Sequence, residues 1–244
     1  MRIIGLLGGM SWESTALYYR LLNEEVRDRL GGVHSAPCLL HSFDFAEVEA
    51  LQAADDWDGA TQLLVDAARG LHAAGAELLV LCTNTMHRVA DELQAGVDVP
   101  LVHIADATAA AVRDAEVTTV GLLGTRYTME GDFYAGRLRD RHDLEVVVPD
   151  ADDRELVHRV IYEELVRGVV TDASRTAYLE VVDRLAARGA QGVVLGCTEI
   201  ELLVPPEAPD GALPRFPTTA IHARAAVELA LDDGAGGHAT VAGR

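Results

Sequence analysis

Two short segments of the chain place a thiol and a threonine at the end of an apolar run. They read LVLCTNTMH (79–87) and VVLGCTEIE (193–201), so Cys82 and Cys197 occupy equivalent positions. A positioned thiol can take or give a proton in a reaction. We therefore interpret the pair as two thiols that face each other across one small-molecule site. One would remove a proton from a carbon atom, and the other would return a proton to the opposite face.

Each of these residues taken alone has a simpler explanation. A single free cysteine is often a buried, unreactive thiol, and this is what we expect of Cys38, which lies in the middle of an apolar run. Thr83 and Thr198 could serve only to hydrogen-bond their own turns, and Thr85 could only cap a helix. The chemical interpretation therefore depends on finding the two thiols at matched turns.

The stretches before the two cysteines repeat one another. The motif GLLG occurs at 5–8 and again at 121–124. Cys82 lies 77 positions after the start of the first copy, and Cys197 lies 76 positions after the start of the second. Apolar runs alternate with helical spacing along the chain, which predicts parallel strands joined by helices. The near-equal spacing indicates an internal duplication.

These patterns predict an α/β fold of two pseudosymmetric lobes, each a mainly parallel sheet flanked by helices, with the active site in the cleft between them. We expect residues 1–103 and 216–231 to form the first lobe and residues 104–215 to form the second. The Gly- and Ala-rich segment 232–244 is expected to be a flexible tail. Ligands of such folds bind beyond the carboxyl ends of the strands, where both cysteine turns lie.

The charge of the chain excludes several classes of function. The 244 residues carry a formal net charge of −19 and include no lysine. An acidic surface argues against nucleic acid or an anionic membrane as the partner. A chain without lysine cannot form the Schiff base that holds pyridoxal phosphate. The missing lysine therefore excludes a pyridoxal-phosphate enzyme.

The cysteine and histidine patterns predict neither a disulfide framework nor a metal site. Three cysteines without a CxxC pair match no disulfide scaffold or zinc ribbon. His87, His103 and His222 lie near the motifs but not at metal-ligand spacing, so we expect neutral, hydrogen-bonded histidines. The N-terminus lacks the features of a signal peptide, and no apolar run is long enough to span a bilayer. We expect a cytoplasmic protein.

The two thiols have differently charged neighbours. The neutral residues 83–85 follow Cys82, whereas Glu199 lies two positions after Cys197. The N-terminus of a helix lowers the pKa of a thiol. We therefore expect one thiol to rest as the thiolate and the other as the thiol. Glu199 is either a helper of Cys197 or an acid that only favours its own helix.

At these residues the chain resembles the aspartate/glutamate racemase family, whose members racemise amino acids without a cofactor. The resemblance covers residues 1–231 and implies a two-lobe fold, a site between the lobes and, usually, a homodimer. It is carried by the segments GLLGGMSWEST (5–15), SFDFAEVEALQ (42–52), LCTNTMH (81–87), PLVHIADATA (100–109), LGCTEIELL (195–203) and TTAIHARAAVELAL (218–231).

The resemblance also implies roles for single residues. The two catalytic cysteines of the family correspond to Cys82 and Cys197. Arg167 stands where the family usually has a lysine, and an arginine can still bind a carboxylate. Pro217 stands where the family motif usually has an aspartate. The substrate-contacting positions fall on Met10, Gln52, Thr83, Asn84, Thr85, Thr125 and Thr198.

We therefore predict a racemase that interconverts L- and D-aspartate, or the enantiomers of glutamate, by a two-base mechanism. Its partner is a small-molecule amino acid. The enzymatic alternatives are a broad-specificity amino-acid racemase and a hydantoin racemase, decarboxylase or isomerase on the same scaffold. A decarboxylase needs only one proton-donating thiol, so the cysteine pair favours racemisation. A non-catalytic ligand-binding module is the alternative from another class.

Overall fold

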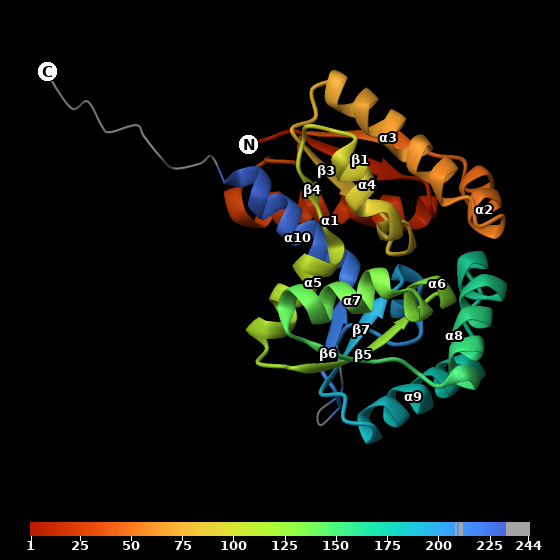
Figure 1. Ribbon diagram of the computed structural model, residues 1–244. Helices are drawn as coiled ribbons and strands as arrows, with labels where there is room; N and C mark the ends of the chain where they lie inside the picture. Colours follow the sequence, from red (N-terminus) through yellow and green to blue (C-terminus); the bar gives the residue numbers. More distant parts are fainter. Residues whose placement is uncertain (208, 210–211, 233–244) are drawn as a thin grey trace, which may run out of the picture.

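Two four-stranded parallel sheets organise the chain, as the computed structural model of residues 1–207, 209 and 212–232 shows (Figure 1). The first sheet has the strand order β2-β1-β3-β4, and the second has the order β6-β5-β7-β8. The predicted α/β fold with two similar lobes is confirmed. The strands are β1 (Ile4–Gly8), β2 (Cys38–Ser42), β3 (Leu78–Leu81), β4 (Leu101–Val102), β5 (Thr119–Gly124), β6 (Glu145–Val147), β7 (Gly192–Gly196) and β8 (Arg215–Pro217).

Helices cover both faces of each sheet, so each sheet has one apolar cluster on either side. The first lobe contains α1 (Trp12–Leu30), α2 (Phe45–Ala53), α3 (Trp57–Ala73), the 3-10 helix η1 (Thr85–Val89) and α4 (Ala90–Ala95). The second contains α5 (Ile104–Asp114), α6 (Arg126–Glu130), α7 (Asp132–His142), α8 (Ala151–Glu163), η2 (Leu165–Arg167), α9 (Asp172–Ala187) and η3 (Thr198–Leu202). The last helix is α10 (Thr218–Leu231).

The central strands explain why the two GLLG motifs and the two cysteines meet. β1 and β3 are buried along their whole length and pair in parallel, as do β5 and β7, where Thr119 at the start of β5 is partly exposed. Continuous apolar runs are typical of strands that helices cover on both faces. Because parallel strands end at the same edge, each glycine turn lies beside the turn that carries its cysteine.

Helix α10 joins the two lobes. It packs against α1 of the first lobe and α5 of the second, and Figure 1 shows it beside both. Its apolar face, which includes Ala223 and Val227, belongs to the core of the first lobe. The strand before it, β8, pairs with β7 in the second sheet and spans the position between 215 and 216 where we placed the lobe boundary. Pro217 ends this edge strand, where a missing backbone N–H is tolerated.

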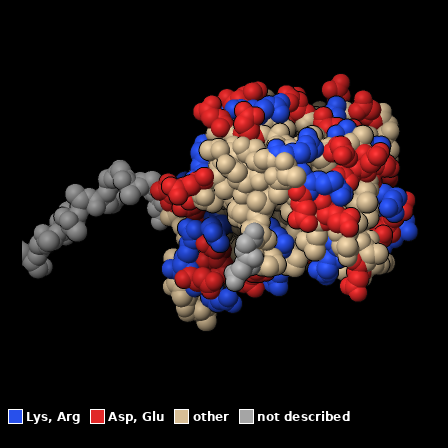
Figure 2. All heavy atoms as spheres, turned by 90° about the horizontal axis from the view of Figure 1, so that it is seen from below, with Lys and Arg blue, Asp and Glu red and all other residues tan. Residues whose placement is uncertain are grey.

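The surface carries both signs of charge. Figure 2 shows acidic and basic side chains interleaved on the face that is seen from below, with uncharged surface between them. Exposed ion pairs join some of the charged residues of the protein, of which Arg27 with Asp28 and Arg139 with Asp132 are examples. Within the described residues, no helix is long and apolar enough to cross a membrane.

Shortening a side chain of α10 in the lobe core should destabilise the protein. Val227 is fully buried, so Val227→Ala should lower the free energy of unfolding by about 2 kcal/mol through lost burial and a residual cavity. Urea unfolding monitored by circular dichroism measures this. Glu228→Ala, one position on and exposed, is the control and should change it by less than about 0.5 kcal/mol. Equal effects of the two would contradict the placement of this helix.

Candidate active site

A cleft between the lobes collects most of the residues predicted from the sequence. It encloses about 600 Å³, the solvent at its mouth included. Both lobes contribute to its lining, and the turns after β1, β3, β5 and β7 all reach it. The predicted residues that line it are Met10, Gln52, Cys82, Thr83, Asn84, Thr85, Thr125, Cys197, Thr198 and Glu199.

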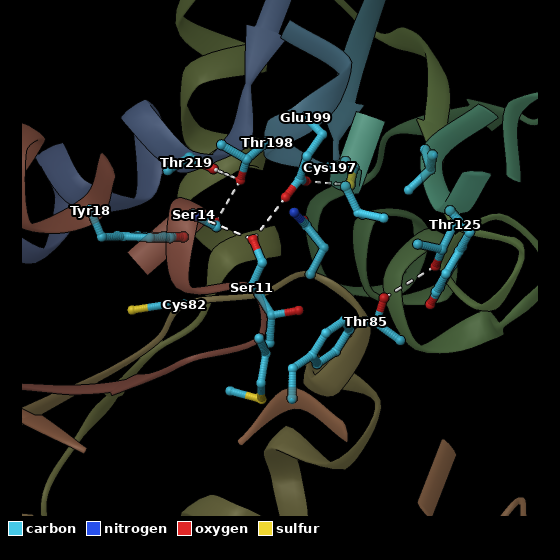
Figure 3. A pocket seen from close by; sticks show the side chains of 18 of the residues that line it. Ser11, Ser14, Tyr18, Cys82, Thr85, Thr125, Cys197, Thr198, Glu199 and Thr219 are labelled. Carbon is cyan, nitrogen blue, oxygen red and sulfur yellow. Dashed lines mark hydrogen bonds between the residues drawn. The ribbon is translucent and has the colours of Figure 1, made fainter. Parts of the chain in front are cut away.

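Cys197 directly follows β7 and caps the N-terminus of η3. Its side chain is half-buried, and its thiol donates a hydrogen bond to Oε2 of Glu199 at 2.9 Å. The other oxygen of that carboxylate, Oε1, accepts a hydrogen bond from the Ser11 hydroxyl at 2.9 Å. Ser11 lies in the first lobe, so the Glu199 carboxylate connects the thiol of one lobe to the glycine turn of the other (Figure 3).

Cys82 directly follows β3 and is completely buried. Its backbone N–H donates to the carbonyl of Leu7 at the end of β1, which fixes the turn beside the first glycine motif. Its thiol lies 3.8 Å from the carbonyl of Val80. Figure 3 shows its sulfur directed away from Cys197, and it belongs to the apolar cluster beneath the cleft. The two thiols therefore reach the same cleft in different environments.

The expectation that one thiol rests as a thiolate is wrong for this structure. Burial raises the pKa of the Cys82 thiol well above its ordinary value. Burial, followed by the charge of Glu199 and the hydrogen bond to it, raises the pKa of the Cys197 thiol as well. Loss of solvent disfavours an anion, and a neighbouring carboxylate disfavours it further. These effects exceed the influence of the short 3-10 helices, which begin near both cysteines.

Hydroxyl groups join the lobes on both sides of the cleft. The Thr198 hydroxyl lies 2.8 Å from that of Ser14 and 2.9 Å from that of Thr219. On the other side, the hydroxyls of Thr85 and Thr125 are 3.1 Å apart (Figure 3). A hydroxyl is both donor and acceptor, so either cluster can turn its hydrogens toward a bound ligand.

Asn84 presents an unused acceptor beside the cleft. Its Nδ2 donates to the Thr218 hydroxyl at 3.0 Å, while its Oδ1 is buried and has no hydrogen-bond partner. An unpaired buried acceptor is costly, so a ligand that donates a hydrogen bond there would recover that cost. Gln52 is also buried in the lining, and its Nε2 donates to Sδ of Met86 at 3.0 Å.

The structure does not bring Arg167 to the cleft. This residue is exposed at the end of η2, whereas its neighbour Val166 lines the cleft. The sequence interpretation also missed several lining residues. Ser11 and Ser14 lie in the segment 5–15 that carries the resemblance, and their polar side chains beside a glycine turn were an available signal. The remaining missed residues are Tyr18, Phe45, Ile161, Tyr162, Gly196, Val166 and Thr219.

The three motif histidines form a buried cluster behind the cleft. His87 lies between His103 and His222, with ring centroids 4.6 and 5.7 Å from it. Burial lowers the pKa of all three, to about 3 for His103 and to about 4 for His222. His222 donates from Nε2 to the carbonyl of Val102, so its Nδ1 accepts from the hydroxyl of Tyr18, a lining residue. They are neutral and hydrogen-bonded, as predicted.

No group of three or more histidine, cysteine, aspartate or glutamate residues in the described part of the chain is placed to hold a metal ion. The lining offers two thiols, one carboxylate, several hydroxyls and the amides of Gln52 and Asn84. This set can move a proton and hold a polar ligand.

Comparison with known proteins identifies the scaffold. Residues 7–226 match the model of the Asp/Glu/hydantoin racemase family. A structure from Yersinia pestis, provisionally assigned as an Asp/Glu racemase, is 55% identical, with 95% of this chain and 100% of that chain covered and a TM-score of 0.89. An aspartate racemase homologue from Pyrococcus horikoshii OT3 is 36% identical, with 94% and 99% covered and a TM-score of 0.80.

A more distant structure shows the same fold. The aspartate racemase of Picrophilus torridus is 19% identical, with 94% of each chain covered and a TM-score of 0.71. Because its identity is low, this likeness concerns the fold alone.

Neutralising Glu199 should make the Cys197 thiol more reactive. Glu199→Gln removes a negative charge and changes the acceptor of the thiol hydrogen bond, two of the causes that raise this pKa. Alkylation of Cys197 at about pH 8 should then be faster by about ten-fold, the effect of one pKa unit. Peptide mass spectrometry with a slow alkylating reagent separates the cysteines. Glu13→Gln, which is exposed, should leave the rate unchanged, and a slower reaction in Glu199→Gln would contradict the electrostatic cause.

The buried histidines should make the protein less stable in mild acid. The unfolded chain protonates His222 near its ordinary pKa of 6.5, but the folded chain does so only near 4. The lowered pKa therefore contributes stability that is complete above pH 6.5 and is lost as the pH falls toward 4. From about pH 7.5 to about pH 5.5, His222 alone should account for about 1 kcal/mol of lost unfolding free energy.

Urea unfolding of His222→Gln at both pH values measures this, because the variant should lose less stability on acidification than the wild type. His34→Gln, at an exposed position, should lose as much unfolding free energy on acidification as the wild type. A pH dependence that is the same in all three proteins would show that His222 is not the cause.

Proposed function

The chain belongs to the Asp/Glu/hydantoin racemase family, and on that premise we propose that it racemises an α-amino acid by a two-thiol mechanism without pyridoxal phosphate. The observation that carries the proposal is the convergence of Cys82 and Cys197, from matched turns of two similar lobes, on one cleft. Family and fold support an amino-acid racemase, an isomerase. The thiol mechanism and the substrate are our proposals.

Glu199 supplies the base that ionises Cys197. It already accepts the thiol hydrogen bond, so proton transfer from Sγ to Oε2 needs no rearrangement. The Ser11 hydroxyl that donates to Oε1 stays in place during this transfer. The resulting thiolate takes the α-proton of one enantiomer, and the Cys82 thiol gives its own proton to the opposite face. The α-carbon inverts, Cys197 ends as the thiol and Cys82 as the thiolate, and Glu199 holds the proton that Cys197 first gave up.

The raised thiol pKa values suit this reaction. The α-proton of an amino acid is a very weak acid, and a base removes it more readily when the pKa of the base is high. Thiols that rest protonated and form a thiolate only beside the substrate meet this requirement. The mechanism therefore requires Cys82 to turn its sulfur from the apolar cluster toward the substrate.

The polar groups of the cleft fit the two ends of an amino acid. The unpaired Oδ1 of Asn84 can accept from the α-ammonium group. The Thr85 and Thr125 hydroxyls, each buried and on opposite lobes, can donate to the α-carboxylate. Stabilising the carboxylate as it takes up charge lowers the barrier to forming the carbanion.

The resemblance and the family favour aspartate or glutamate as the substrate, with a broad-specificity amino-acid racemase as the alternative. A small-molecule partner, a cytoplasmic location and a homodimer remain parts of the proposal. A hydantoin racemase, decarboxylase or isomerase on this scaffold, and a non-catalytic binding module, are the functions that the following experiment separates from it.

The protein is incubated in deuterated water with each enantiomer of aspartate, glutamate and a set of neutral amino acids, without added cofactor. We expect racemisation accompanied by deuterium at the α-carbon. Cys82→Ser and Cys197→Ser should each reduce kcat/KM by about 10²–10⁴-fold, the usual contribution of a positioned acid or base. Cys38→Ser is the matched control, because Cys38 is half-buried outside the residues described as lining the cleft.

Three outcomes would reject the proposal. Exchange that survives both substitutions would exclude the two-thiol mechanism. Binding of amino acids without exchange would indicate a binding module. Loss of carbon dioxide from a malonate, or racemisation of a hydantoin with no exchange in any amino acid, would assign one of the related activities.

A further inference from the structure

Four side chains give the cleft an apolar wall where the two lobes approach each other. Phe45 begins α2, Ile161 and Tyr162 lie in the last turn of α8, and Val166 lies in η2. Figure 1 shows α2 and α8 at the same end of the molecule, one in each lobe. A substrate held by its ammonium and carboxylate groups must direct its side chain toward another part of the lining. This wall is available for it.

The charged lining of the cleft is acidic. Among the described residues that line it, Glu199 carries a carboxylate and none is an arginine or a histidine. Glu199 lies within hydrogen-bond distance of Cys197, so it stands beside the reacting atoms. The chain as a whole adds a net charge of −19. A second carboxylate on the substrate would lose water against the apolar wall and would meet a like charge.

We infer that the side-chain subsite takes an uncharged side chain, so that neutral amino acids are better substrates than aspartate or glutamate; this inference rests on the proposed function. An uncharged side chain gains from burial against Phe45, Ile161 and Val166. It also leaves the Glu199 carboxylate free to accept the proton of Cys197. The apolar wall and the acidic lining therefore both favour a substrate with an uncharged side chain.

The nearby arginines are placed elsewhere. Arg167, next to Val166, is exposed. Arg88 stacks on the Trp57 ring at 4.2 Å, and Arg126 lies 3.6 Å from the carboxylate of Glu155. A side-chain carboxylate in the cleft would have to draw one of these groups from its present position. Arg167 is the group to test, because it follows a lining residue in the chain.

The test compares each acid with its nearly isosteric amide. Initial rates of α-deuterium incorporation are measured for both enantiomers of aspartate, asparagine, glutamate, glutamine and methionine. We expect kcat/KM for the best neutral amino acid to exceed that for either acid by at least about ten-fold. Aspartate or glutamate as the best substrate would overturn the inference and leave the proposed function intact. Exchange with none of the amino acids would overturn both.

Two charge-adding variants test the wall directly. Val166→Arg places a cation in the lining, so it should raise the ratio of kcat/KM for aspartate over asparagine by at least about ten-fold. Val169→Arg adds the same charge to a neighbouring residue that is 45% exposed, so it should leave the ratio unchanged. Equal effects of the two variants would overturn the assignment of the wall as the side-chain subsite.

Arg167→Met tests the competing arrangement. We expect the same aspartate-to-asparagine ratio as in the wild type, because the exposed guanidinium does not serve the substrate. A selective fall of about ten-fold or more in kcat/KM for aspartate, with asparagine unchanged, would overturn the inference by showing that Arg167 reaches the side chain.

Discussion

The hydrogen bonds of the Glu199 carboxylate connect the chemistry of the cleft to the arrangement of the lobes. One oxygen holds the Cys197 thiol of the second lobe, and the other holds the Ser11 hydroxyl of the first, each at 2.9 Å. A movement that separates the lobes must therefore release Ser11 or turn the carboxylate. The same carboxylate adds to the effect of burial in raising the pKa of the Cys197 thiol, so turning it away would favour the thiolate.

The remaining contacts across the cleft are mostly single hydrogen bonds between hydroxyl groups. Ser14 with Thr198 and Thr85 with Thr125 are the main examples. Each such bond contributes about 1 kcal/mol net, so together they hold the lobes in register without preventing them from opening. Outside the cleft, the apolar packing of α10 on α1 and α5 joins the lobes, and so do the ion pairs of Asp91 with Arg137 and Arg141. Rigid lobes with a weakly bonded cleft suit a site that must admit and release a small molecule.

Local pattern was enough to predict the sheets, the duplicated turns and most of the lining, because a parallel strand carries its C-terminal residues to a known edge. Cys82, Thr125 and Cys197 follow from this rule alone. The thiol pKa values do not follow, because burial depends on packing from segments distant in sequence. Arg167 was placed by resemblance rather than by geometry, and nothing in its own sequence indicates which way its helical turn faces.

The two thiols have different surroundings although the lobes are pseudosymmetric. On the proposed mechanism, this makes the two half-reactions different. Cys197 has its own base in Glu199, so it can ionise beside the substrate with a short proton transfer. Cys82 is enclosed in an apolar cluster, where its thiol lies 3.8 Å from the carbonyl of Val80. Its thiolate arises when it gives its proton to the carbanion. Abstraction by Cys197 is thus assisted by Glu199, while abstraction by Cys82 starts from the less populated protonation state in which Cys82 is the thiolate.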